Sequence, residues 1–392
     1  MPVVNRIAEF HADMTAWRRD LHEHPELALR ETRTSGVVQR KLAEFGVDEI
    51  VTGLAGTGVV GVIRGQQPGG AIGLRADMDA LPIEEATGLP YASKHPGVMH
   101  ACGHDGHTTM LLGAARYLAE TRNFAGTVYV IFQPAEELFG GGEMMVKEGL
   151  FERFPMDQVF GMHNWPSHPA GEFLWRVGPT MAAVASIEIA VNGKGAHGAY
   201  PHNGVDPIVA AAAIVIALQS VVARNVDPLE NAVLTIGQIG GGNAFNVIPE
   251  TVRMKGTARW FSPEVGDILE AGVVRVARGV AEGFGATVEV AFKRTYPATV
   301  NDADATALAR RAAESVAGAA RVSHMERPTM GGEDFSFMLN AKQGSYIMLG
   351  GGRSAIDPQV HHPKYDFNDD ILPVGASYWA TLAEQLLPRR PA

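Results

Sequence analysis

Two different alternations of apolar and polar residues divide the chain into two kinds of segment. In the first kind, helical patterns such as residues 107–120 alternate with short apolar strands, predicted at residues 59–64, 71–76 and 127–132. A helical pattern also covers residues 14–45, where His24-Pro25 predicts an interruption. Apolar strands that alternate with helices are typical of a sheet covered by helices, so this part is predicted to be α/β.

The second kind of segment begins near residue 182. Ile187, Ile189 and Val191 alternate with polar neighbours, which is typical of an antiparallel strand with one exposed face. Similar patterns return at residues 252–258 and 288–292, and helices are predicted between the three strands at residues 206–224 and 263–284. Ser262 and Pro263 are suited to the start of the second helix.

After about residue 294 the first kind of pattern returns, and it ends in a helix predicted at residues 373–387. The chain is therefore predicted to contain an α/β domain, residues 1–181 and 295–392, with a central mixed sheet flanked by helices. A smaller α+β domain, residues 182–294, is predicted to be inserted into it.

Composition disfavours several classes of protein. The 392 residues are 46% hydrophobic and 19% charged, as in an ordinary globular chain, and the net charge of −10 argues against a nucleic-acid partner. The longest apolar stretch, residues 208–218, is too short to cross a bilayer and predicts a buried helix. With no signal-peptide pattern and a single cysteine, the expected location is cytoplasmic, without a membrane partner.

That cysteine gives the first sign of chemistry. Cys102 lies in MHACGHDGH, residues 99–107, together with three histidines and one aspartate. A thiolate and the imidazole of His104 can reach one ion if Gly103 allows a sharp turn, and such ligands favour zinc-like transition metals over magnesium or calcium. The alternative is an unreactive buried thiol beside surface histidines.

Acid pairs follow two of the predicted strands. Asp77 and Asp79 come after residues 71–76, and Glu136-Glu137 come after residues 127–132. The carboxyl ends of the strands form the edge at which open α/β sheets bind their ligands. Asp79 can orient a metal ligand through a hydrogen bond, whereas Asp77 can do the same or cap the turn.

Histidines occur in two further turns. His163 lies in GMHNWP after an apolar pair and is expected at a strand end. His361 and His362 lie in VHHPKYDFND, where a proline fixes the turn. Ligand-rich turns at four places in one α/β chain favour a metal site.

In their order along the chain, these motifs resemble those of the M20 family of metallopeptidases and aminoacylases, in particular its M20D branch of N-acyl amino acid amidohydrolases. The resemblance runs nearly end to end. It is carried by RRDLHEHPEL, GLRADMDALPIEEATGLPYAS, MHACGHDGHTTMLLGAA, FQPAEE, GMHNWP, GKGAHGAYPHNGVDPI, NVIPE, MGGEDF and HHPKYDFND. It implies a larger domain that binds two metal ions and a smaller domain that serves as a lid or dimerisation domain.

The resemblance also implies a ligand set for two divalent ions, which can be Zn, Mn, Co or Ni. Within the paired histidines it favours His361 over His362. Asp79 matches an acid that supports a ligand, and Asp77 stands where other branches carry a histidine ligand. The implied ligands are Cys102, His104, Glu137, His163 and His361.

Glu136 matches the general base of the family, which takes a proton from a water made acidic by the two ions and passes it to the leaving nitrogen. His197 matches a histidine that reaches the site from the neighbouring subunit. The oxyanion formed in the site needs hydrogen-bond donors. Asn246 matches a substrate-contacting amide, and Arg259 matches an arginine that pairs with the substrate's carboxylate. A homodimer or higher oligomer is therefore expected.

The predicted function is metal-dependent hydrolysis of N-acyl amino acids such as hippurate to a carboxylic acid and an amino acid. A dipeptidase or aminopeptidase on the same scaffold is the alternative, and a dipeptide would require an acidic group for its free amine. A Cys102 nucleophile is disfavoured because a metal-bound thiolate is poorly available for attack. A binding protein with a structural metal is disfavoured because such a site needs no spare base like Glu136.

Overall fold

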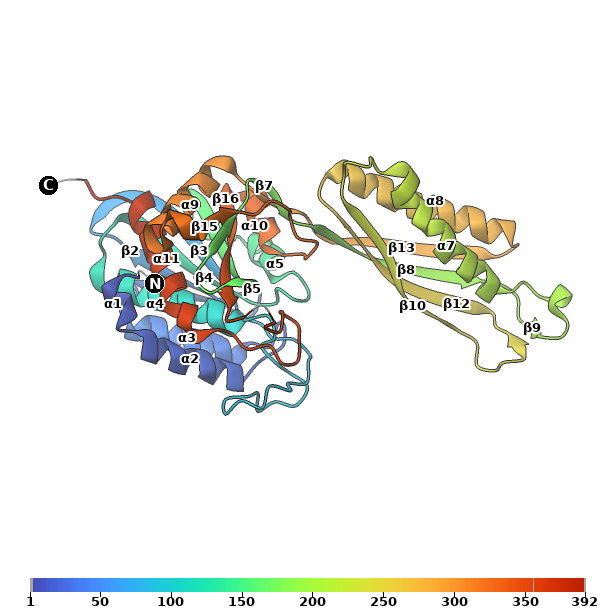
Figure 1. Cartoon of the computed structure of the whole chain (residues 1–392), viewed down its shortest axis with the longest axis horizontal. Helices are drawn as coiled ribbons and strands as arrows, with labels where there is room; N and C mark the ends of the chain where they lie inside the picture. Colours follow the sequence, from blue (N-terminus) through green and yellow to red (C-terminus); the bar gives the residue numbers. More distant parts are fainter. Residues whose placement is uncertain (1–2, 355, 391–392) are drawn as a thin grey trace. The chain divides into compact units, whose positions relative to one another are not determined.

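The structure is a computed structural model that describes residues 3–354 and 356–390. The chain divides into two compact units. The second unit comprises Met181–Ala298 and Thr329–Gly332, and the first unit comprises the other described residues. Figure 1 shows both units with their helices and strands labelled.

The first unit combines helices with a mixed sheet. Its helices are α1 (Asn5–Ala8), α2 (His11–Glu23), α3 (Thr32–Glu44), α4 (His104–Thr121), α5 (Gly141–Lys147), α6 (Leu150–Arg153), α9 (Ala303–Ala317), α10 (Phe335–Ala341) and α11 (Leu372–Leu386), with 3₁₀ turns η2 (Ala319–Arg321) and η3 (Asp369–Ile371). Its strands are β1 (Glu49–Leu54), β2 (Gly58–Arg64), β3 (Gln67–Asp77), β4 (Ala125–Gln133), β5 (Gln158–Pro169), β6 (Phe173–Trp175), β7 (Gly178–Met181), β14 (Thr299–Asn301), β15 (Val322–His324) and β16 (Gly344–Gly352).

Eight of these strands form one sheet in the order β1-β2-β4-β3-β5-β16-β6-β15. The central strands β4, β3, β5 and β16 run parallel to one another, and β1, β2 and β6 introduce antiparallel pairs. Because β4, β3 and β5 are parallel neighbours, the segments that follow them leave the sheet at the same edge.

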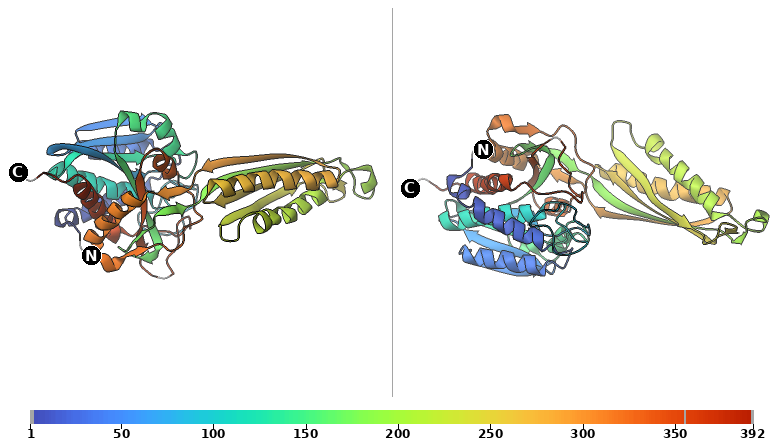
Figure 2. Two further views of the ribbon diagram at one scale, coloured as in Figure 1. Left: turned by 90° about the horizontal axis from the view of Figure 1, so that it is seen from above. Right: turned by 60° about the horizontal axis from the view of Figure 1, so that its bottom comes forward.

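Helices cover both faces of this sheet (Figure 2). A Cβ added at Gly161 of β5 would meet Tyr346 of β16 and Phe335 of α10, whereas the next residue, Met162, lies against Gly375 of α11. Successive residues of a strand point to opposite faces, so α10 and α11 lie on opposite sides. The predicted α/β architecture with a central mixed sheet is confirmed.

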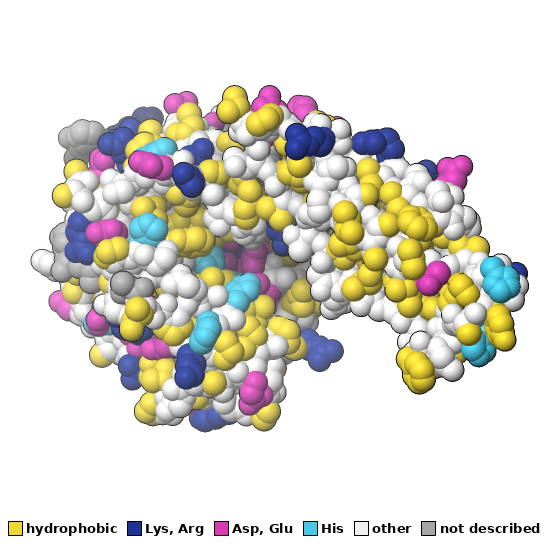
Figure 3. Space-filling view, turned by 45° about the vertical axis from the view of Figure 1, so that its right-hand side comes forward, with side chains coloured by type: hydrophobic (Ala, Val, Ile, Leu, Met, Phe, Trp, Pro, Cys, Tyr) yellow, Lys and Arg dark blue, Asp and Glu magenta, His cyan; other side chains and the backbone are white. Residues whose placement is uncertain are grey.

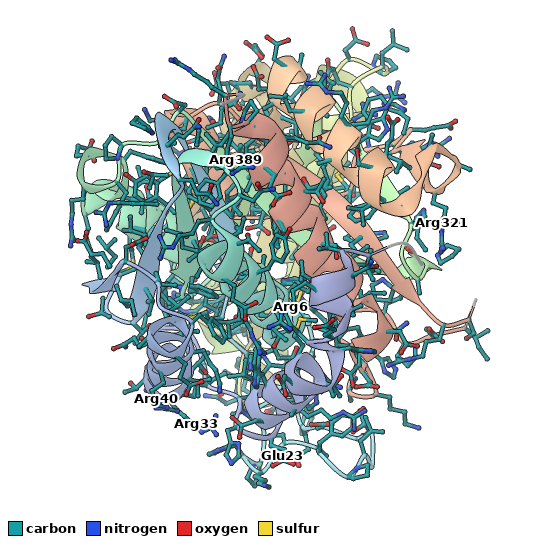
Figure 4. The ribbon with its side chains drawn as sticks, turned by 90° about the vertical axis from the view of Figure 1, so that its left-hand side faces the viewer. Arg6, Glu23, Arg33, Arg40, Arg321 and Arg389 are labelled. Carbon is teal, nitrogen blue, oxygen red and sulfur yellow. The ribbon has the colours of Figure 1, made fainter. Side chains whose placement is uncertain are left out.

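The predicted interruption of the first helical pattern is also confirmed. Helix α2 ends at Glu23, directly before His24-Pro25, and α3 begins at Thr32. Proline disfavours helical geometry in the residue before it, which accounts for the break. Arg33 and Arg40 of α3 lie at the outer surface in Figure 4, whereas Val38 and Leu42 are fully buried in the core.

The second unit is a smaller antiparallel sheet with two long helices. Its helices are α7 (Pro207–Asn225) and α8 (Pro263–Gly283), with the 3₁₀ turn η1 (Pro201–Asn203). Its strands are β8 (Ala183–Asn192), β9 (Ala196–His197), β10 (Ala232–Gly241), β11 (Val247–Ile248), β12 (Thr251–Trp260) and β13 (Thr287–Tyr296). Four of them form a sheet in the order β10-β12-β8-β13, in which each neighbouring pair is antiparallel.

The two helices share one apolar core with this sheet. Ile187, Ile189 and Val191 of β8 are buried in that core, as their alternation predicts. The side chain of Ser262 accepts a hydrogen bond from the backbone of Val265, so the predicted N-cap of α8 is confirmed. A cap of this kind is worth about 1 kcal/mol.

Helix α7 packs into the core of the second unit, as the prediction of a buried helix requires. By length and composition alone it is apolar enough to cross a membrane, yet one face is buried in this core through Ala210, Ile214 and Leu218. It is therefore a core helix of this unit. Its opposite face is exposed, and Val209 and Ile216 on that face are 50% and 75% exposed.

Candidate metal centre

The sequence motifs meet at the carboxyl edge of the large sheet. Asp77, the last residue of β3, pairs in register with Gln133, the last residue of β4. The segments that follow, one carrying Asp79 and the other carrying Glu136 and Glu137, therefore start side by side. Figure 3 shows acidic and histidine side chains gathered around a hollow in this part of the surface.

Gly103 makes the turn that brings Cys102 and His104 to one place. Its φ of 90° lies in the left-handed region, and an added Cβ would lie 2.5 Å from the side-chain nitrogen of Asn164 and 2.7 Å from the hydroxyl of Tyr365. Only glycine fits there without strain. Helix α4 then begins at His104, and both neighbours of Gly103 are buried.

Asp79 fixes the orientation of His104. The ring Nδ1 of His104 donates to Oδ1 of Asp79 over 3.2 Å, and Oδ2 of Asp79 accepts from the backbone nitrogen of Glu137 over 2.9 Å. This arrangement leaves Nε2 of His104 as the ring atom available to an ion. Asp79 thus has the contacts that the predicted supporting role requires.

His163 lies within β5, not at a strand end as predicted. Strand β3 pairs with β5 only as far as Gly161, but β16 continues to pair with β5 past His163 to Pro169. Nδ1 of His163 donates to the carbonyl oxygen of Asn164 over 2.6 Å, and Nε2 lies 3.3 Å from Sγ of Cys102. Burial and the neighbouring His107 lower the pKa of His163, which favours the neutral form that binds metals.

Glu136 and Glu137 lie in a tight loop between β4 and α5. Ala135 has a φ of 57°, and the loop is closed by a hydrogen bond from the backbone nitrogen of Gly141 to the carbonyl oxygen of Ala135 over 3.0 Å. Glu136 is only 7% exposed. Burial and the carboxylates of Glu333 and Glu137 raise its pKa, the direction that suits a group which must hold a proton during a reaction.

His361 joins the site from the C-terminal segment. Its backbone nitrogen donates to the carbonyl oxygen of Ala101 over 2.7 Å, and its Nε2 lies 3.2 Å from Oε1 of Glu137. The φ of His361 is 66°, an uncommon value for a residue with a side chain. The ring of His362 instead accepts a hydrogen bond from the backbone of Lys364 over 3.0 Å, within its own turn.

These side chains form groups that fit metal ions. Cys102, His104 and His163 offer ligand atoms within 4.8 Å of one another, and so do Cys102, Glu137 and His361. Among the described residues, Nε2 of His104 and Oε1 of Glu137 are buried without a hydrogen-bond partner, although His361 contacts the latter. Buried polar atoms are normally paired, so atoms left unpaired here fit a cation.

The charges of the site also favour a cation. Burial favours the neutral ring of His104, but the nearby carboxylates of Asp77 and Asp79 have the larger combined effect and raise the pKa of His104 to about 10. Burial and the carboxylates of Glu137 and Glu136 raise the pKa of the Cys102 thiol. A thiolate here therefore needs a neighbouring positive charge, which weakens the alternative of a free Cys102 nucleophile.

Asp77 takes part in a different set of contacts. It accepts from Arg75 over 2.7 Å and from Nδ1 of His107 over 2.6 Å, and both partners are buried. Arg75 also pairs with Glu333 and Asp334, each over 3.0 Å. Oδ2 of Asp77 also lies 3.7 Å from Nε2 of His104, and Asp77, His104 and His107 offer ligand atoms within 4.8 Å of one another.

Some supporting residues had no signal in the sequence. Asn164 donates to Nε2 of His107 and to the carbonyl of Cys102, and Tyr365 donates to Asn164 over 2.6 Å. Both residues stand in quoted motifs, GMHNWP and HHPKYDFND, but a polar residue beside a histidine does not reveal a partner far away in the chain.

The remaining predicted residues lie in the second unit. His197 ends β9, is exposed, and accepts a hydrogen bond from the backbone of Ala199 over 3.0 Å. Asn246 is exposed just before β11. Arg259 on β12 is half-buried, its guanidinium contacts Thr257 and the carbonyl of Ala258, and no carboxylate pairs with it within the described parts of the chain. Burial lowers the pKa of Arg259.

Comparisons with known proteins agree with this geometry. A family model described as "Peptidase family M20/M25/M40" matches residues 73–385. The chain is 41% identical over 387 residues to a hippurate hydrolase of Campylobacter jejuni, covering 99% of this chain and 100% of the relative. It is 42% identical over 364 residues to an N-acetyl-L-cysteine deacetylase of Bacillus subtilis, covering 92% and 85%. A solved Bacillus subtilis structure, described as a dinuclear metal binding peptidase from the M20 family, matches with a TM-score of 0.83 at 36% identity, covering 97% and 99%.

Proposed function

Because the chain belongs to peptidase family M20/M25/M40, with its sequence matched to the family across most of its length, we propose that it is a metal-dependent hydrolase of N-acyl amino acids. It cleaves the amide bond to give a carboxylic acid and a free amino acid. The relatives named hippurate hydrolase and N-acetyl-L-cysteine deacetylase, each above 40% identity, support an amidohydrolase. The observation that carries the proposal is the buried Glu136 beside groups of side chains that can hold metal ions.

Cys102, His104, Glu137, His163 and His361 are the proposed ligands. The two divalent ions they hold, of the Zn, Mn, Co or Ni type, would make a water molecule acidic and polarise the amide carbonyl. Asp79 orients His104, and the carbonyl of Asn164 orients His163. Both contacts leave a ring Nε2 directed at the ion sites.

Glu136 is the proposed general base and acid. It takes a proton from the attacking water and delivers that proton to the nitrogen of the departing amino acid, so the carboxylate is restored at the end of the cycle. His197 is the proposed donor to the oxyanion of the tetrahedral intermediate, and Asn246 is a proposed substrate contact.

Arg259 is the proposed recognition group for the substrate's α-carboxylate. A half-buried guanidinium without a carboxylate partner in the described residues supports this role, because such a group normally pairs with an anion. Near the proposed ligands, Leu138 and Phe139 are 49% and 69% exposed and follow Glu137 directly. They offer an apolar surface for an acyl group such as benzoyl.

Hippurate, its amide hippuramide and a dipeptide test this assignment. The wild-type enzyme should show a much larger kcat/KM for hippurate than for hippuramide, and Arg259→Ala should lose most of that preference. A carboxylate paired with a partly buried guanidinium contributes ~2 to 5 kcal/mol. Equal rates on hippurate and hippuramide in the wild type would refute carboxylate recognition, and a preference for dipeptides with a free amine would favour the dipeptidase alternative.

The second unit is the proposed dimerisation domain. Val209 and Ile216 on α7, with Leu229 and Phe245 in the loops, are at least half exposed. Figure 3 shows apolar side chains gathered on this unit. Contiguous exposed apolar side chains favour a protein interface, and a second copy of the chain is the proposed partner. Sedimentation of the purified protein tests this proposal.

A further inference from the structure

Arg18 on α2 is fully buried and surrounded by three carboxylates. Its Nε lies 2.6 Å from Oδ1 of Asp369, and its Nη1 lies 3.4 Å from Oδ1 of Asp366 and 3.7 Å from Oδ2 of Asp105. Asp105 is also fully buried, and its second partner is the ring of His22 at 2.8 Å. Apart from Tyr91, over which Arg18 stacks, the contacts of this guanidinium are therefore mainly ionic.

The three carboxylates come from the two segments that carry the proposed ligands. Asp105 is the residue after His104, in the first turn of α4. Asp366 and Asp369 follow His361 in the C-terminal segment. Arg18 thus connects the segment of Cys102 and His104 to the segment of His361, although it is not itself a proposed ligand.

The segment of His361 is held in place by side-chain contacts, among them an ion pair between Arg353 and Asp366 and a hydrogen bond from Tyr365 to Asn164. Between the end of β16 at Gly352 and the start of η3 at Asp369, its described residues form no helix or strand. His361 itself has a positive φ and a side chain that is 51% exposed. A ligand in such a segment depends on its fixed points, and the contact of its backbone with Ala101 is one of them.

Arg18 is a buried fixed point that contacts both segments. Asp105 has a second partner in His22 and Asp369 has one in Arg19, but a buried carboxylate is unstable unless its charge is compensated, so the guanidinium stabilises both carboxylates in place. Removing a group that orients a metal ligand without touching the ion commonly lowers the metal affinity by about 10- to 100-fold.

We propose that Arg18 is a positioning residue of the metal centre, which holds His361 in place for the ion that it shares with Cys102 and Glu137. The proposal rests on the metal-binding part of the proposed function and not on the substrate. Loss of Arg18 should weaken one of the two ions selectively, while the ion held by Cys102, His104 and His163 stays bound.

Arg19 offers a matched control. Its Nη2 lies 2.9 Å from Oδ2 of the same Asp369, and its guanidinium also stacks over Tyr91. Its side chain is 45% exposed, and it does not contact Asp105. Replacing Arg19 removes the same charge and a contact to the same carboxylate, but it leaves the bridge between the two segments intact.

The test is metal binding by the full-length protein. Protein stripped with a chelator is titrated with Zn²⁺ against a chromophoric competitor, for the wild type, Arg18→Met and Arg19→Met. We expect two ions per chain in the wild type and in Arg19→Met. In Arg18→Met the affinity for the ion that His361 binds should fall by about 10- to 100-fold, while the other ion is retained. Wild-type affinities for both ions in a folded Arg18→Met would overturn the proposal.

A second variant and an absorption spectrum distinguish a positioning role of Arg18 from a general effect on the stability of the fold. Asp369→Asn removes the carboxylate on the side of His361, keeps Arg18 in the core, and should show the same selective loss even if Arg18→Met does not fold. With Co²⁺ as the probe, the absorption spectrum of Asp369→Asn at two ions per chain should resemble that of His361→Ala. A spectrum and affinities like those of the wild type would refute positioning. If the wild type binds two ions but does not cleave N-acyl amino acids, the proposed substrate fails while the role of Arg18 stands.

Discussion

At the scale of single residues, two side chains that are adjacent in the sequence have different surroundings in the site. Glu136 and Glu137 are adjacent, yet Glu137 contacts His361 while the pKa of Glu136 is raised by burial and by Glu333. The residue types of the site could be predicted from the sequence, because Cys, His and Glu at strand ends have few other common uses. Arg18 and Asn164 could not be assigned a role, because their partners lie far away along the chain.

Replacing Glu136 tests its role in proton transfer. Glu136→Gln keeps the size of the side chain and should leave two ions bound, while kcat falls by roughly 10²- to 10⁴-fold because the proton carrier is lost. Metal analysis and steady-state rates on hippurate measure the two effects. Near-normal kcat at full metal content would remove Glu136 from the mechanism.

His22 should make stability depend on pH. Burial opposes its protonated form, but hydrogen bonds to Asp105 and Glu85 raise its pKa to about 9, above the usual value of 6.5. Since the folded state binds this proton more tightly, the stabilisation is complete below pH 6.5 and is lost as the pH rises through 9. The shift corresponds to about 3 kcal/mol, and the same ion pair also lowers the pKa of Asp105, so it is counted once.

Denaturant unfolding of chelator-treated protein measures this dependence. The free energy of unfolding of the wild type should exceed that of His22→Gln most at pH 6 and should approach it above pH 9. A difference between the two proteins that stays constant over this range would show that His22 does not carry the proton.

At the scale of elements, the periodicity of apolar residues located most helices and strands of the core. Strand β5 is the instructive exception, because the sequence after Phe160 carries His163, Asn164 and Trp165 and does not look like a continuing strand. Pairing with β16 extends it, and pairing between distant segments leaves no local pattern. Likewise, the exposed face of α7 could not be predicted, since its apolar residues surround the helix.

The turn between Cys102 and α4 should not tolerate a side chain. In Gly103→Ala the φ of 90° and the close contacts with Asn164 and Tyr365 should lower the free energy of unfolding by about 1 to 3 kcal/mol and weaken metal binding. Gly279 in α8 is the control, because a Cβ there meets nothing within 4 Å. Gly279→Ala should stabilise by up to about 1 kcal/mol, as helix propensity predicts. Thermal unfolding and metal titration compare the two variants.

At the scale of the whole molecule, the proposed catalytic side chains belong to two units. Glu136 lies in the first unit, whereas His197 and Arg259 lie in the second. If His197 serves a neighbouring subunit, inactive Glu136→Gln and inactive His197→Ala should together regain part of the activity after subunit exchange. One of the two sites in a mixed dimer then has both residues intact. Verified mixed dimers that remain inactive would show that His197 works within its own chain or has no part in catalysis.

The two ends of the long insertion are neighbours in hydrogen-bonded strands. Val184 near its start pairs with Tyr296 near its end, and just outside it β7 pairs with β14. A stretch of more than a hundred residues therefore leaves and re-enters the larger fold through neighbouring strands, and Thr329–Gly332 join the same unit from a separate part of the chain. Because its two ends lie next to each other, the long stretch can be exchanged as one piece of sequence. An engineer could replace the proposed substrate contacts His197 and Arg259 in this way without altering the segments that carry the proposed metal ligands.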